Sequence, residues 1–138
     1  MYAEHVFDKN QKQYVIRKGC SSDGEELYAL ITPILVTYGL KQKQAADDNV
    51  DEDLFKIDEL YFGNNGCFEV LLHPEDNTTI IGSAGIMREN DHVCELRKMY
   101  LRPDFKGLGL GKMLLERLMN KAAVSFYFLC HVVTKGLF

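Results

Sequence analysis

Hydrophobic residues recur at helical spacing after a short strand candidate at residues 14–18. The residues that share one helical face are Leu27, Leu30, Ile31, Ile34, Leu35 and Tyr38. Ser22 or Asp23 can cap the start of this helix, and Gly39 can end it. Pro33 interrupts the pattern, so we expect a kinked helix or two shorter ones.

Three runs of strand-forming residues follow a polar connection at residues 41–53. They cover residues 68–73, 79–88 and 92–101, and the turn signal Asn65-Gly66 precedes the first of them. Because only short turn segments separate the runs, we predict three antiparallel strands in a meander.

A glycine-rich loop and an amphipathic helix come next, and then an apolar run. The helical stripe consists of Leu114, Leu115, Leu118, Met119 and Ala122. Residues 124–133 are rich in β-branched and aromatic residues, which predicts a strand buried on both faces. The fold class is therefore mixed α/β: a mostly antiparallel sheet, flanking helices and one parallel strand–helix–strand crossover. On length alone, residues 1–138 form a single domain.

Composition excludes several classes of protein. With 46% hydrophobic and 26% charged residues, the chain is neither disordered, collagen-like nor a coiled coil. No run of about 18 apolar residues and no apolar leader is present, so we expect a cytoplasmic protein without a membrane partner. The four cysteines and four histidines show no metal-ligand spacing, so we expect reduced thiols and no metal.

Charge is unevenly distributed along the chain. Residues 97–138 carry 8 Lys/Arg and 2 Asp/Glu, although the net charge of the whole chain is −4. With a pI near 5.5 and few aromatic residues in this basic segment, a small phosphate-bearing ligand fits better than a nucleic acid.

The loop between the third strand run and the second helix carries the chemistry. It reads Lys106, Gly107, Leu108, Gly109, Leu110, Gly111 and Lys112. Its glycines expose the first amides of a helix, where the helix dipole also favours an anion, so the loop suits a pyrophosphate. A Walker loop would need glycine at position 106, and a dinucleotide fingerprint would need it at 112 or 114, so both motifs are excluded. The alternative is a tight turn without a ligand.

Residues 95–118 resemble the acyl-CoA-binding segment of the GNAT N-acetyltransferase superfamily. The family pattern Arg/Gln-x-x-Gly-x-Gly/Ala reads here Lys106-x-x-Gly109-x-Gly111, and we expect the lysine to weaken binding without abolishing it. The similarity in the order of elements covers residues 14–131. It implies a GNAT-like fold, acetyl-CoA as acyl donor, and direct attack by a primary amine of a small molecule or a protein.

The resemblance also assigns roles to residues. Met99, Tyr100 and Leu101 would pair through their backbone with the pantetheine arm, along an edge freed where the third strand run and the run at 124–133 splay apart. The loop amides would hold the pyrophosphate, and the Met99 amide would stabilise the charge developing on the carbonyl oxygen. The whole cofactor-binding set is Met99, Tyr100, Leu101, Lys106, Gly107, Leu108, Gly109, Leu110, Gly111 and Lys112.

Glu95 lies where some family members place a carboxylate base. The alternative is a strand residue that forms a salt bridge with Arg97. Cys94 as an acyl-enzyme nucleophile is weighed against a buried strand cysteine, and Tyr61 and Tyr100 as pocket-lining residues against packing residues. The seven acids between residues 47 and 59 suggest a cationic acceptor such as a polyamine, lysine or an aminoglycoside, or else a solvated surface.

The family normally continues past this last apolar run, so the chain is expected to be C-terminally shortened. Residues 124–133 would then be an unprotected apolar edge, which predicts a homodimer or poor solubility. Two alternatives to an enzyme follow. One is an acyl-CoA-binding sensor or assembly subunit without turnover, and the other is a nucleotide-phosphate-binding protein of another fold.

Overall fold

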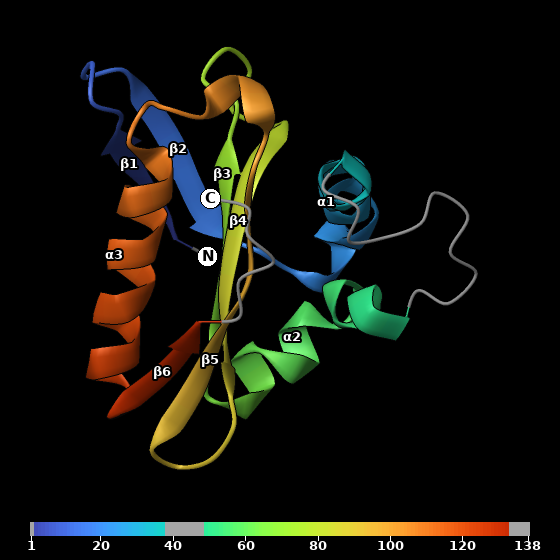
Figure 1. Cartoon of the computed structure of the whole chain (residues 1–138), viewed down its shortest axis with the longest axis vertical. Helices are drawn as coiled ribbons and strands as arrows, with labels where there is room; N and C mark the ends of the chain where they lie inside the picture. Colours follow the sequence, from blue (N-terminus) through green and yellow to red (C-terminus); the bar gives the residue numbers. More distant parts are fainter. Residues whose placement is uncertain (1, 38–48, 133–138) are drawn as a thin grey trace.

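The computed structural model describes residues 2–37 and 49–132, which form one six-stranded sheet with helices on both faces (Figure 1). The strands lie side by side in chain order, and only the last pair is parallel. They are β1 (Ala3–Phe7), β2 (Gln13–Lys18), β3 (Cys67–Leu72), β4 (Ile80–Arg88), β5 (Val93–Leu101) and β6 (Leu129–Val132). The predicted meander is confirmed as β3, β4 and β5, and the predicted crossover as β5, α3 and β6.

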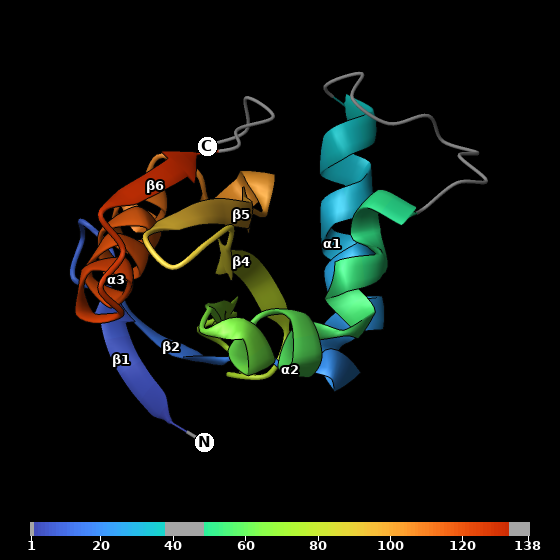
Figure 2. The same cartoon turned by 90° about the horizontal axis from the view of Figure 1, so that it is seen from below.

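The helices divide between the two faces of the sheet, as Figure 2 shows from below. Helix α3 (Leu110–Val124) covers one face, and α1 (Gly24–Thr37) and the short α2 (Ile57–Leu60) cover the other. Short 3-10 turns complete the structure: η1 (Ser21–Asp23), η2 (Asn49–Phe55), η3 (Phe62–Asn64) and η4 (Pro103–Phe105). The mixed α/β fold class is therefore confirmed.

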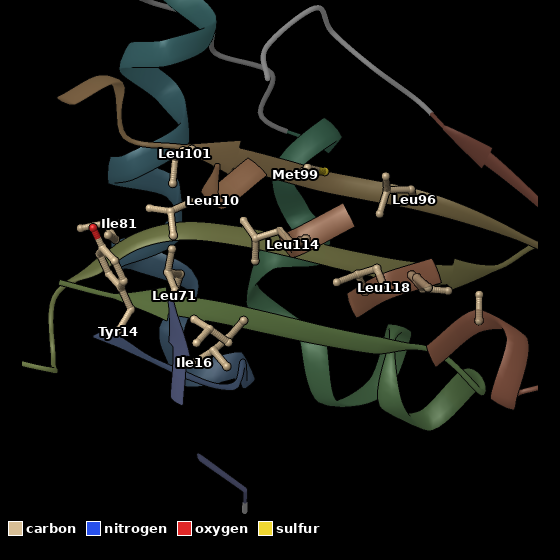
Figure 3. Close-up of a cluster of buried hydrophobic side chains, with 14 of the residues drawn as sticks. Tyr14, Ile16, Leu71, Ile81, Leu96, Met99, Leu101, Leu110, Leu114 and Leu118 are labelled. Carbon is tan, nitrogen blue, oxygen red and sulfur yellow. The ribbon is translucent and has the colours of Figure 1, made fainter. Parts of the chain in front are cut away.

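The core beneath α3 is built from one stripe of that helix and alternate residues of the strands (Figure 3). Leu110, Leu114 and Leu118 are completely buried and belong to one cluster with Ile16 and Leu71. Each buried leucine contributes about 1.5–3 kcal/mol relative to an exposed one. This packing fixes the first turn of α3 against the upper part of the sheet.

The core on the other face confirms most of the predicted α1 stripe. Leu27, Ile31, Ile34 and Leu35 are buried. Tyr38 and Gly39 lie outside the described residues. Of the two alternatives expected for Pro33, division into two helices is wrong: α1 runs from Gly24 to Thr37 with Pro33 exposed inside it. The Thr37 hydroxyl donates a hydrogen bond to the Pro33 carbonyl over 2.8 Å, so a side chain satisfies a carbonyl in the last turn of the helix.

The predicted strand at residues 124–133 is corrected in length and in burial. Helix α3 continues to Val124, a turn with Phe126 at φ 67° follows, and β6 has four residues. Val124, Phe126 and Phe128 are 79–82% exposed. An apolar run does not by itself separate the end of a helix from a strand, and here the run is divided between the two.

Candidate functional site

The glycine-rich loop of residues 106–112 forms the start of α3. Gly109 is the residue that caps the helix; its φ is 83° and no side chain caps this end. The first helical hydrogen bond runs from the Met113 amide to the Gly109 carbonyl over 3.2 Å. Within the described part of the chain, the amides of residues 107–112 donate to no backbone carbonyl. A row of unpaired donors therefore stands at the positive end of the α3 dipole.

The loop is open at Gly107. Gly107 has φ 80°, and no atom lies within 4 Å of the position that a Cβ would take there. Such a conformation favours glycine, and the missing side chain leaves its amide accessible. The geometry fits an anion that approaches the backbone closely.

A contact with the β1–β2 turn fixes the loop. The amide of Lys9 donates to the Leu108 carbonyl over 2.8 Å. A shallow hollow of about 240 Å³ lies beside this contact, and Lys9 and Lys112 both line it. Lys112 is exposed, with its Nζ 3.8 Å from Glu116, while Lys106 is half-buried at the start of the loop. Sequence reasoning missed Lys9, because no local pattern connects residue 9 with a loop about a hundred positions later.

The edge of β5 opens next to the loop. Strand β6 pairs with β5 only from Val93 to Leu96, and no strand among the described residues pairs with the same edge from Arg97 to Leu101. The Arg102 amide donates to Ile81 of β4 over 2.7 Å. The direction of the backbone N–H and C=O groups alternates from one residue to the next in an antiparallel pair. Tyr100, two residues before Arg102, therefore directs these groups to β4, whereas Leu101 and Met99 direct theirs to the open edge. The loop and two of the three predicted strand residues therefore share one border of the sheet.

A β-bulge lies where β6 leaves β5. Ser83 pairs with Tyr100 and Gly85 with Arg97, so that two residues of β5, Lys98 and Met99, oppose one residue of β4. Lys98 has φ 56°, and its carbonyl accepts a 2.7 Å hydrogen bond from the Ser83 hydroxyl. The bulge interrupts the alternation of side chains. Met99 packs beneath α3, whereas Lys98 reaches η2 on the opposite face.

Lys98 enters a buried polar cluster that sequence reasoning did not find. Its Nζ lies 3.4 Å from Asp53 Oδ1, and the Tyr61 hydroxyl donates to Asp53 Oδ2 over 2.5 Å. Burial, together with the neighbouring Asp53 carboxylate, raises the pKa of Tyr61 far above its usual value. Tyr61 is completely buried and Tyr100 nearly so, which makes both of them packing residues. No sequence signal joins Asp53 to Lys98.

Glu95 and Cys94 precede the bulge. The Glu95 Oε1 atom lies 3.1 Å from Arg97 Nε, and both side chains are half-buried, so the ion-paired alternative matches the structure. The role of Glu95 as a base stays a prediction. Cys94 is completely buried, and burial followed by its neighbour Cys130 raises the pKa of its thiol. Cys94 is thus a buried strand cysteine rather than an activated nucleophile.

Two kinds of feature are absent from the described residues. Within residues 2–37 and 49–132, no helix combines the length and apolar character needed to cross a membrane. The same residues hold no group of three or more His, Cys, Asp or Glu side chains placed to bind a metal ion.

Comparisons with known proteins agree on one family. Residues 26–133 match the model of the acetyltransferase (GNAT) family. The uncharacterized N-acetyltransferase YjgM of Escherichia coli is 29% identical over 127 residues, which cover 87% of this chain and 71% of the relative.

Solved structures share the fold. An acetyltransferase of the GNAT family from Staphylococcus aureus superposes with a TM-score of 0.75 at 23% identity, over 86% of this chain and 71% of that one. A predicted acetyltransferase from Clostridium acetobutylicum, solved with acetyl-CoA, gives a TM-score of 0.68 at 20% identity, over 88% of this chain and 80% of the other.

Proposed function

Because the chain belongs to the acetyltransferase (GNAT) family, we propose that it transfers the acetyl group of acetyl-CoA to a primary amine of a small molecule or a protein. The observation that carries this proposal is the junction of unpaired loop amides with the open edge of β5. A fold neighbour from Clostridium acetobutylicum was solved with acetyl-CoA, and another from Mycobacterium tuberculosis with CoA.

The junction can hold an acyl-CoA in two parts. Amides of residues 107–112 would donate to the pyrophosphate, with Lys106 and Lys112 adding positive charge. The backbone groups of Met99 and Leu101 would pair with the amides of the pantetheine arm as an added strand would. Tyr100 would contribute by packing, since its backbone groups face β4.

Acetyl-CoA supplies an acetyl group activated as a thioester. In a direct transfer, a nitrogen–carbon bond to the acetyl carbon forms as the carbon–sulfur bond breaks, and the amine proton ends on a base while the thiolate of CoA takes up a proton. Glu95 would accept the amine proton, directly or through a water molecule. The Met99 amide, in the bulge, would donate to the carbonyl oxygen as negative charge develops there.

Calorimetric titration with acetyl-CoA, CoA and ATP, followed by a thiol-release assay over a panel of amines, tests the proposal. We expect both CoA compounds to bind, ATP to bind more weakly, and at least one amine to release CoA. Binding of acetyl-CoA without thiol release from any amine would favour the acyl-CoA-binding sensor or assembly subunit. A preference for ATP would contradict both functions.

A further inference from the structure

We infer that the acceptor amine carries an anionic group, a carboxylate or a phosphate, and that Arg97 recognises this group with the help of Arg88. The inference rests on the proposed function and specifies its acceptor. It follows from the hydrogen-bond partners of the charged side chains around one hollow of the molecule.

The hollow has a volume of about 350 Å³ and lies between the sheet and the α2 region. Figure 1 shows α2 beside the lower ends of β4 and β5, on the face opposite α3. The lining side chains are Glu52, Asp53, Lys56, Leu60, Asn64, Met87, Arg88 and Arg97. Arg97 lies in the wall of this hollow two residues before Met99, so the hollow borders the open edge of β5.

The carboxylates in this wall are already engaged. Asp53 accepts from Tyr61 and lies beside Lys98, and its side chain is only 8% exposed. Glu52 lies at the solvent side, 3.1 Å from Lys56 Nζ. The acids of this wall therefore offer a poor site for a polycation, contrary to the cationic acceptor that the acidic sequence suggested.

The two guanidinium groups, in contrast, keep free donors. Arg97 uses Nε toward Glu95 and Nη1 toward the Met87 sulfur, and its Nη2 has no partner among the described residues. Arg88 uses Nη2 toward Asp91, and within the same residues its Nε and Nη1 are unpaired. A guanidinium presents several N–H groups in one plane, an arrangement that suits the oxygens of a carboxylate or a phosphate. Half-burial of Arg97 strengthens such a hydrogen bond relative to one in open solvent.

The position of Arg97 links recognition to chemistry. Its Nε already contacts Glu95, the proposed base, and Met99, the second residue of the bulge, lies two positions after Arg97. An acceptor that binds Arg97 through its anion would hold its amine, a few bonds away, close to these two groups. A neutral or polycationic amine of the same size would lack this anchor and would leave the free Nη2 group unpaired.

Paired acceptors that differ in one group test the inference in the thiol-release assay. Butylamine is compared with 4-aminobutanoate for a carboxylate, ethanolamine with O-phosphoethanolamine for a phosphate, and spermidine represents a polycation. We expect kcat/KM to be higher for the anionic member of at least one pair by about tenfold or more, the size expected for one charge-assisted hydrogen bond. The pair that shows the difference identifies the anion.

Arg97→Gln should abolish this ratio, mainly by raising KM for the anionic acceptor. Any effect of the substitution on Glu95 acts on both members of a pair, so the ratio reports recognition alone. Arg17→Gln is the matched control: Arg17 is also a partly buried arginine that pairs with a carboxylate, Asp23, but it lies on β2 and outside the hollow. We expect this control to keep the ratio of the unchanged protein.

Failure of the inference is distinguishable from failure of the proposed function. Turnover of both neutral amines that equals or exceeds that of their anionic partners, or turnover of spermidine that exceeds that of both anionic amines, would overturn the inference and leave the acetyltransferase standing. If acetyl-CoA binds but no amine reacts, the inference is tested by binding alone. Both anionic amines are then titrated into the CoA complexes of the unchanged protein and of Arg97→Gln. Millimolar binding that Arg97→Gln weakens would support the inference, and no binding, or equal binding by the variant, would overturn it.

Discussion

The ammonium nitrogen of Lys98 lies 3.4 Å from Asp53 Oδ1, and the two side chains are 9% and 8% exposed. This pair joins a residue with positive φ in the β5 bulge to η2, a segment about 45 positions earlier in the chain. Since Met99 follows Lys98, the same contact helps to set the direction of the Met99 amide. The position of η2 is thereby coupled to the donor proposed for the acetyl carbonyl.

Lys98→Met should destabilise the protein by about 3–5 kcal/mol, because it leaves the Asp53 carboxylate buried without its ammonium partner. Urea unfolding monitored by circular dichroism measures the change. Adding Asp53→Asn should recover part of the loss, since the uncompensated charge is then removed. A loss below about 1 kcal/mol, the value typical of exposed pairs, would contradict the buried pair.

Gly107→Val should raise the Kd for acetyl-CoA by about tenfold or more. The new side chain would occupy the open space at Gly107 and would block hydrogen bonds from the loop amides to a charged group, each worth about 1.5–3 kcal/mol. Calorimetric titration measures the affinity. Asn65→Ala, at a positive φ of 57° outside the loop, controls for backbone strain and should keep the affinity. An unchanged Kd for Gly107→Val would argue against pyrophosphate binding at this position.

Asp23 gives a defined dependence of stability on pH. Burial tends to raise its pKa, but hydrogen bonds from Arg17 and from the Cys20 amide outweigh burial and hold the pKa below the ordinary value of 3.8. The stabilisation is therefore complete above pH 3.8 and is lost as the pH falls from there through the folded-state pKa. Urea unfolding at several pH values should show the stability gap between the unchanged protein and Asp23→Asn closing in that range. A gap that is constant with pH would exclude Asp23 as its source.

Cys94 should resist alkylation in the native protein. Its thiol is completely buried and its pKa is raised, so iodoacetamide at about pH 8 should label it only after unfolding. Peptide mass spectrometry of native and unfolded samples measures the labelling. Incubation with acetyl-CoA should likewise leave Cys94 unacetylated, whereas an acetylated Cys94 peptide would indicate an acyl-enzyme in place of direct transfer.

Phe126 and Phe128 should promote self-association, since both are at least 80% exposed beside β6. The homodimer remains a prediction from the sequence. Sedimentation velocity over a range of concentrations should show larger species for the unchanged protein than for the double variant Phe126→Ser/Phe128→Ser. Identical monomeric profiles at high concentration would remove these residues as an interface.

Local signals allowed the meander, α3 and the glycine loop to be predicted. Strand β1 was missed, because it is only five residues long, four of them are exposed, and polar and apolar residues do not alternate along it. Its place in the sheet depends on distant contacts: Arg117 of α3 donates to Glu4 of β1 and to the completely buried Glu69 of β3.

The site, too, has features that the local sequence predicts and features that depend on distant contacts. The loop amides follow from glycines close together in the chain, as does the pairing of Glu95 with Arg97 two residues later. The contacts of Lys9 with Leu108 and of Lys98 with Asp53 join segments far apart, and no spacing rule predicts them. The end of α3 was misplaced for another reason, since Val124 and Phe126 are apolar yet exposed.

The hydrogen bond from the Lys9 amide to the Leu108 carbonyl connects the β1–β2 turn to the glycine-rich loop, so a probe in this turn would respond to changes in the loop. A fluorophore attached to an engineered cysteine at Asn10, an exposed residue next to Lys9, would sense changes in that loop without touching the helix that follows it. Screening of donors and inhibitors by an optical signal thus becomes practical even before an acceptor has been identified.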